Sequence, residues 1–179
     1  LCGQSAPHIA HMWHMPGHIY SGLKRYEDAC WQQEASARVD HANMMHDGVL
    51  PDQIHNFAHN NEWLIRNLMH VGRAQDALDL AKNMSELPRH PKYNSANNGS
   101  NKYGRDRLFD VVKQFELWDE AIAIAKADRM KKEIEDLGGT VLEYVDTPIA
   151  ETSQRMPQLT TSLLQKYGDK WTHSLAIND

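Results

Sequence analysis

Cysteine is scarce in this chain of 179 residues, which contains only Cys2 and Cys30. Two cysteines so placed form neither a disulfide framework nor a C-x-x-C motif, and no C-x-x-C-H haem-attachment sequence is present. These absences exclude the disulfide-rich, zinc-finger and c-type haem classes. We expect Cys30 to be a small buried hydrophobic residue.

Long hydrophobic runs and clusters of positive charge are also missing. No apolar segment approaches the roughly 18 residues that a membrane-spanning helix requires, which predicts no membrane span. The chain has 19 Lys and Arg against 24 Asp and Glu, a net charge of −5. It has no basic stripe to neutralise phosphates, so we expect no nucleic-acid partner.

Common catalytic signatures are absent as well. The sequence contains no G-x-S-x-G, no Gly-rich phosphate loop and no H-E-x-x-H. We therefore favour a binding protein over an enzyme and assign no catalytic residue. The first residue is Leu1 and not Met, which predicts a processed chain or a piece of a longer protein.

Helical periodicity runs through most of the chain. Apolar residues recur at helical spacing in segments 16–25, 27–44, 52–70, 74–86, 105–116 and 119–137. The segment 88–104 is rich in Asn, Ser and Gly and predicts a long loop. We further expect a short strand at 140–145 and a helix at 149–167, interrupted at Pro157.

A short theme recurs where one predicted helix joins the next. The sequences RYEDA, RAQDA and LWDEA end in Ala29, Ala77 and Ala121, which are spaced by 48 and 44 residues. Antiparallel helices approach closely only where side chains are small, which explains the alanine. Helix pairs repeating at such a period indicate a solenoid.

This theme resembles the tetratricopeptide repeat (TPR) family. The matching residues are Gly17, Tyr20, Tyr26 and Ala29, then Gly72 and Ala77, then Trp118 and Ala121. The resemblance covers about residues 10–137, with a period longer than the family's 34 residues. It implies an all-α solenoid of antiparallel helix pairs over residues 1–137, followed by a C-terminal extension at 138–179.

Two histidine-containing strings resemble one bacterial group within that family. His-Met-Pro-Gly-His-Ile-Tyr (14–20) and His-Asn-Phe-Ala-His-Asn-Asn (55–61) are similar to proteins in which TPR units follow a redoxin domain. This resemblance implies an exported or periplasmic protein and the accessory part of a larger enzyme. The redoxin domain and its C-x-x-C motif are not in this sequence.

The resemblance also implies which side chains line a concave groove. The matching positions are His11, His14 and His18, then His59, Glu62 and Arg66, then Tyr103, Asp106 and Asp110. We expect a protein or peptide segment to contact His18, His59, Glu62, Trp63, Arg66, Tyr103, Asp106 and Asp110. In this interpretation the chain is a binding scaffold with a histidine-rich groove.

Helical spacing makes a metal ion an alternative guest of the same groove. A His-x-x-x-His sequence places two imidazoles on one helix face, as in His14/His18 and His55/His59. The candidate ligands are His11, His14, His18, His55, His59 and Glu62, a donor set that suits Zn, Cu, Ni or Fe. The alternative hypothesis is therefore a metalloprotein or metalloenzyme.

Two residues count against that metal site. Arg66 shares the predicted face and would repel a cation unless Glu62 or Asp106 pairs with it. Pro16 predicts a break that separates His11 and His14 from the helix of His18.

Overall fold

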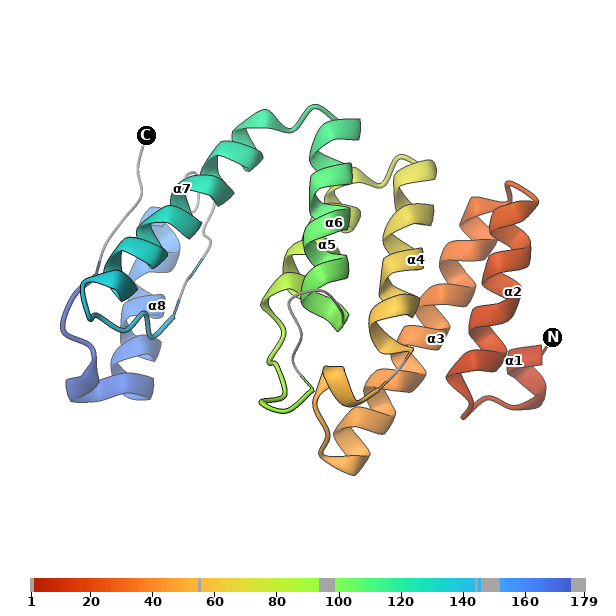
Figure 1. Ribbon diagram of the computed structural model, residues 1–179, viewed down its shortest axis with the longest axis horizontal. Helices are drawn as coiled ribbons and strands as arrows, with labels where there is room; N and C mark the ends of the chain where they lie inside the picture. Colours follow the sequence, from red (N-terminus) through yellow and green to blue (C-terminus); the bar gives the residue numbers. More distant parts are fainter. Residues whose placement is uncertain (1, 55, 94–98, 144, 146–151, 175–179) are drawn as a thin grey trace. The chain divides into compact units, whose positions relative to one another are not determined.

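The computed structural model describes residues 2–54, 56–93, 99–143, 145 and 152–174. The regular elements are α1 (Cys2–Ser5), α2 (Ala10–Gly22), α3 (Tyr26–Asp47), η1 (Pro51–Gln53), α4 (Phe57–His70), α5 (Ala74–Glu86), α6 (Gly99–Gln114), α7 (Trp118–Asp136), α8 (Thr152–Tyr167) and η3 (Gly168–Lys170). All of them are helical (Figure 1). The prediction of an all-α fold is confirmed for the described residues.

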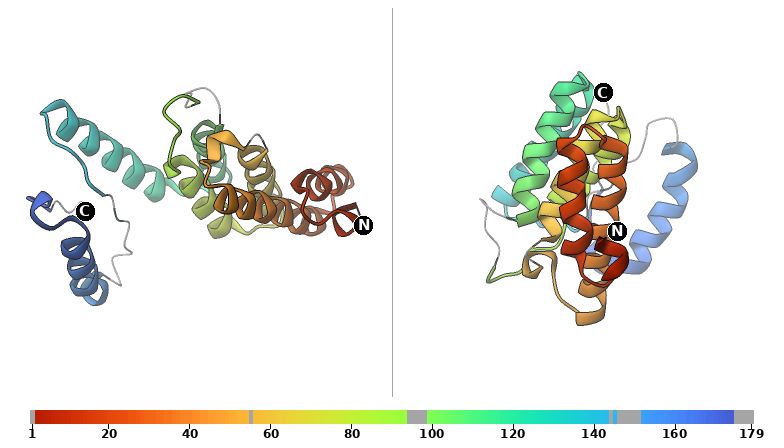
Figure 2. Two further views of the ribbon diagram at one scale, coloured as in Figure 1. Left: turned by 90° about the horizontal axis from the view of Figure 1, so that it is seen from below. Right: turned by 90° about the vertical axis from the view of Figure 1, so that its right-hand side faces the viewer.

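The chain forms two compact units, Leu1–Trp118 and Asp119–Asp179, which we call the N-terminal and C-terminal units. In the N-terminal unit, each helix from α2 to α6 packs against the next one along the chain, and α4 also packs against α6. Figures 1 and 2 show these helices side by side in chain order. None of the described helices is long and apolar enough to cross a membrane, as predicted.

The core of the N-terminal unit is built largely from small and branched residues. Ala29, Ile65, Ala77, Ala81 and Val111 are completely buried. The alanines allow neighbouring helices to approach closely, as the sequence predicts, because no long side chain separates their backbones.

One turn ends four helices of the N-terminal unit. At the end of α3 it is formed by the left-handed Gly48, where Val49 donates to the Met44 carbonyl, and it recurs at the ends of α2, α4 and α6. Lys24, Gly72 and Glu116 each adopt a left-handed conformation at the end of a helix. In each case the following amide donates to the carbonyl five residues back, from Arg25 to Tyr20, Arg73 to Leu68 and Leu117 to Val112. This Schellman-type bond satisfies carbonyls that the helix end would otherwise leave unpaired. The left-handed residues that end α2, α4 and α6 have the same spacing as Ala29, Ala77 and Ala121, so the repeat in sequence is also a repeat in backbone conformation.

Five local expectations were wrong, and one of them is the interruption at Pro157, because α8 continues through that residue. Helix α2 continues through Pro16, so no break separates the histidines at 11, 14 and 18. Helix α4 begins only at Phe57, after η1, because Pro51 supports a 3-10 turn and the backbone is extended at Ile54. Residues 140–143 and 145 form no strand, since a strand requires a hydrogen-bonded neighbour.

The remaining error concerns the predicted loop at 88–104, whose end is helical because α6 begins at Gly99. Tertiary packing overrides composition there. A Cβ on Gly104 would lie 2.6 Å from the backbone nitrogen of Ser85, so glycine permits the close approach of α5 and α6. Asn101 also donates a 2.8 Å hydrogen bond to the Ser85 carbonyl.

Candidate metal centre

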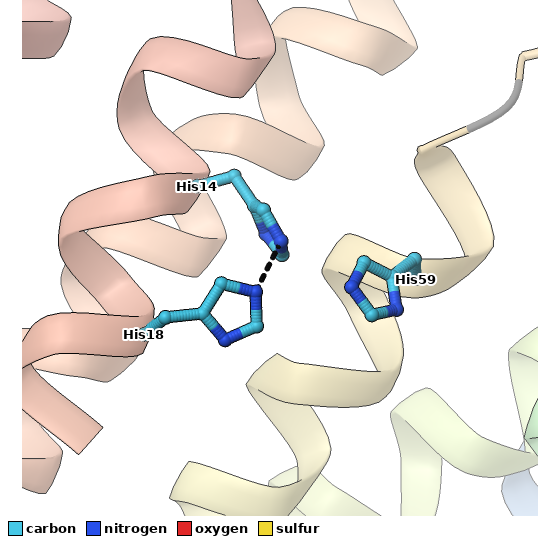
Figure 3. A group of neighbouring side chains, drawn as sticks. All are labelled: His14, His18 and His59. Atoms are coloured by element: carbon cyan, nitrogen blue, oxygen red, sulfur yellow. Dashed lines mark hydrogen bonds between the residues drawn. The ribbon is translucent and has the colours of Figure 1, made fainter. Parts of the chain in front are cut away.

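Three histidines from two helices converge in the N-terminal unit. His14 and His18 lie one turn apart on α2, and His59 faces them from the first turn of α4 (Figure 3). One ring nitrogen of each lies within 4.8 Å of the others. The ring centroids of His14 and His59 are 4.9 Å apart, and those of His18 and His59 are 5.7 Å apart. We call these three residues the histidine cluster.

His14 is held from behind by α3. It is buried, with 2% of its surface exposed, and its Nδ1 lies 2.7 Å from Oε1 of Gln33. The Gln33 amide nitrogen donates to the His14 carbonyl at 3.3 Å, so the amide oxygen is the atom that faces Nδ1. His14 must therefore carry its proton on Nδ1, which leaves the lone pair of Nε2 directed at the cluster.

Gly17 makes this support possible. It lies on α2 between His14 and His18, and a Cβ there would collide with the Gln33 side chain. A glycine at this position thus lets Gln33 lie against α2 and reach His14. The Ser36 hydroxyl donates a 2.8 Å hydrogen bond to the Ala10 carbonyl, which joins the same two helices one turn further along.

His18 completes the pair on α2. Its Nε2 lies 2.6 Å from Nε2 of His14, and because the His14 nitrogen is the acceptor, His18 donates this hydrogen bond. The Trp63 ring stands edge-on to His18, with centroids 4.3 Å apart. Trp63 therefore forms the wall of the cluster on the α4 side.

His59 is backed by a carboxylate. Its Nδ1 lies 3.7 Å from Oε2 of Glu62, one turn along α4. The other oxygen of Glu62 lies 3.4 Å from the Arg107 guanidinium of α6, and Arg107 also pairs with Asp110 at 2.7 Å. A buried carboxylate beside Nδ1 favours the proton on that nitrogen and leaves Nε2 of His59 as a potential ligand.

Burial keeps the imidazoles of His14 and His18 neutral. It lowers the pKa of His14 to about 4, with smaller contributions from the neighbouring histidines, even though the Gln33 hydrogen bond raises it. Burial and the neighbouring His59 and His11 also lower the pKa of His18. Neutral imidazole is the form that binds a metal ion. These two imidazoles can therefore bind a metal cation at neutral pH.

The remaining residues predicted as metal ligands lie outside the cluster. His11 is exposed, and its ring centroid is 5.8 Å from that of His14. Glu62 lies behind His59 and does not face the centre, as its bond to Arg107 shows. His55 is outside the described residues.

The residues predicted to bind a partner are placed around the cluster. The Arg66 guanidinium lies over the Trp63 ring, 4.8 Å from its centroid, and Glu62 pairs with Arg107. On α6, Asp106 pairs with Lys102, which also lies near the Tyr103 ring. Asp110 pairs with Arg107. The cluster thus joins α2 to α4, and the Glu62–Arg107 pair joins α4 to α6.

Gln33 and Arg107 were not among the residues predicted from the sequence. Gln33 had a signal, because it falls at helical spacing on the same face of α3 as Ala29, Ala37 and Met44, all of them buried. A polar residue on a buried stripe requires a partner. Arg107 had no comparable signal, since its role depends on the contact between α4 and α6.

Comparison with known proteins adds no match. No protein-family model, no curated protein and no solved structure matches this chain. The interpretation of the site therefore depends on its own geometry and chemistry.

Proposed function

We propose that the protein binds a transition-metal ion through His14, His18 and His59, on the groove face of a TPR-like helical scaffold. The observation that supports this most directly is the convergence of three imidazole nitrogens within 4.8 Å. Gln33 and Glu62 stand behind two of these rings. Histidine ligands of metals commonly donate their other ring N–H to such a partner, which fixes the ring orientation.

The three rings would have to shift to bind a metal ion. Two imidazole nitrogens bound to a tetrahedral zinc at 2.0–2.1 Å lie about 3.3 Å apart. The 2.6 Å between His14 and His18 would open by well under 1 Å, and His59 would move inward. His18 would shift its proton to Nδ1, because Nε2 would then face the metal.

Zn, Cu, Ni and Fe all accept three nitrogen ligands of this kind. Three protein ligands are the usual number in catalytic zinc sites, which keep a further position for water or substrate. The same arrangement also suits a metal carrier. We therefore assign metal binding and no reaction.

The TPR-like part of the proposal has its own support. The Schellman-type turns at Lys24, Gly72 and Glu116 repeat at the spacing of the alanines. The first helices of successive pairs, α2, α4 and α6, contact one another through the histidine cluster and the Glu62–Arg107 pair. A TPR-like solenoid would present this face as its concave groove.

Binding of a protein segment is the second candidate function. An open pocket between α4 and α6 is lined by Arg66, Arg107, Asp110 and Lys113, among others. With Trp63 beside it, this surface combines charged groups and an aromatic anchor, as many recognition surfaces do. A protein segment with acidic side chains could pair with Arg66, Arg107 and Lys113.

The decisive test is metal analysis of the untagged protein, purified without chelator, alongside a His18→Ala/His59→Ala variant. We expect close to one equivalent of bound metal after reconstitution with Zn²⁺, and at least about a 100-fold loss of affinity in the variant. A His41→Ala/His46→Ala variant, which removes two exposed histidines of α3, should bind normally. Equal binding by all three proteins would contradict the histidine cluster as the site, and no binding by any would leave the segment-binding groove as the better account.

A further inference from the structure

The histidine cluster is buried at His14 and exposed at His59. His14 is buried against α3, whereas 40% of the His59 side chain is exposed. Among the described residues, no Cys, Asp, Glu or further His joins the three imidazoles in the cluster. A tetrahedral metal held there would therefore direct its fourth position toward solvent, on the face shared by α2 and α4.

The charge of such a site favours an anion at that position. Three neutral imidazoles leave the full +2 charge of a divalent metal uncompensated. The carboxylate of Glu62 lies behind His59 and pairs with Arg107. An oxyanion that replaces water on the metal would supply the missing negative charge.

The surface beside the open position has two further features. The Trp63 ring lies edge-on to His18, and the Arg66 guanidinium lies over the same ring. Trp63 is thus the common neighbour of a metal ligand and a cation. Arg107, in contrast, is already held by Glu62 and Asp110.

Helix geometry sets the distance between the metal and Arg66. His59 and Arg66 are seven residues apart on α4, a rise of about 10 Å along the axis. Long side chains on a helix lean toward its N-terminus, so the Arg66 guanidinium lies closer to the metal position than its Cα does. A short ligand can therefore reach both.

We propose that the metal-loaded site binds a small dicarboxylate. One carboxylate takes the open metal position and displaces water, a short apolar linker lies against Trp63, and the second carboxylate pairs with Arg66. Guanidinium and carboxylate form two parallel hydrogen bonds, which gives this end its selectivity. This inference rests on the proposed metal site.

The test uses the full chain loaded with Co²⁺, whose visible absorption reports changes in coordination. Acetate and glutarate are titrated separately. We expect glutarate to alter the Co²⁺ spectrum at a concentration at least about tenfold lower than acetate, because it gains a charge-assisted contact with Arg66. The Arg66→Gln variant should bind Co²⁺ as the parent does but should lose this preference for glutarate.

The matched control is Arg38→Gln, which removes an exposed arginine of α3 that pairs with Glu34. It should keep the glutarate preference. A Co²⁺ spectrum that neither acid changes would overturn the ligand proposal and leave the metal site standing, and so would a glutarate preference that survives in Arg66→Gln. Failure of Co²⁺ to bind at all would overturn the metal site and the ligand proposal with it.

Discussion

The two units of this protein are both helical, but they differ in what their helices bury. The N-terminal unit has a core that includes the completely buried Ile65 and Val111. In the described residues of the C-terminal unit no side chain is buried, and Ile122 and Leu164 are each 52% exposed. Amphipathic periodicity is present in both units.

The difference shows what a pre-organised site requires. Within the N-terminal unit, α4 packs against α3, α5 and α6, so its side chains are confined from several directions. His14 depends on Gln33 of another helix for its orientation. Amphipathic helices alone do not supply such support, because ligand geometry is held by residues packed behind the site.

The largest expected effect tests the contrast between the units directly. Ile65→Ala removes a completely buried side chain and should lower the free energy of unfolding by about 2–5 kcal/mol. Leu164→Ala removes a half-exposed one and should cost less than about 1 kcal/mol. Urea denaturation of both variants measures the difference, and equal losses would mean that both units depend on comparable cores.

Removing a buried charge in the N-terminal unit should have the next largest effect on the free energy of unfolding. Asp40 is 5% exposed and accepts a 2.6 Å hydrogen bond from Asn60. Burial raises its pKa from 3.8 to about 6, so the ionised carboxylate destabilises the fold above that pH. Asp40→Asn should therefore raise the free energy of unfolding at pH 7.5 by up to about 3 kcal/mol.

The shifted pKa values of Asp40 and His14 determine how the stability of the fold changes with pH. The stability contributed by Asp40 is present at about pH 4 and is lost as the pH rises through 6. His14 has the opposite sign, since its pKa falls from 6.5 to about 4 on folding and its contribution is lost as the pH falls through that range. Asp40→Asn should thus lose stability more steeply than the parent between pH 6.5 and 4. The exposed Asp128 of the C-terminal unit provides the control. Asp128→Asn should change neither the free energy of unfolding at pH 7.5 nor the dependence of that free energy on pH.

Two glycines on α2 test the packing behind the histidine cluster. Gly17→Ala places a methyl group against the Gln33 side chain and should destabilise the fold by about 1–3 kcal/mol. A Cβ on Gly22 would have no heavy atom within 4 Å, so Gly22→Ala should be neutral or slightly stabilising. Thermal unfolding of both variants makes the comparison, and a neutral Gly17→Ala would show that Gln33 is free to move away.

The smallest effect tests the hydrogen bond that His14 Nδ1–H donates to Oε1 of Gln33. Gln33→Ala should lower Zn²⁺ affinity about 10- to 100-fold, because His14 loses the partner that fixes its tautomer. Competition with a chelator of known affinity measures the change. Gln32→Ala, at the adjacent buried position, should retain the parent affinity, whereas equal losses in the two variants would point to general damage to α3.

Much of the fold followed from local patterns. Periodicity predicted the helices of the N-terminal unit to within a few residues at most ends. Ala29 and Ala77 marked close helix contacts and are completely buried, whereas Ala121 is only partly buried. The start of α6 was not predictable, because Gly104 and Asn101 acquire their meaning only against Ser85 of α5. Composition assigned that segment to a loop.

By itself the sequence determined the all-helical fold, the recurring turns and the histidines at helical spacing, because each of these depends on neighbours a few residues away. The tertiary structure alone decided which histidines meet. It brought His14 and His18 to His59, left His11 exposed and placed Glu62 behind the cluster. It also supplied Gln33 and Arg107, since contacts between helices depend on how whole surfaces pack and not on local spacing.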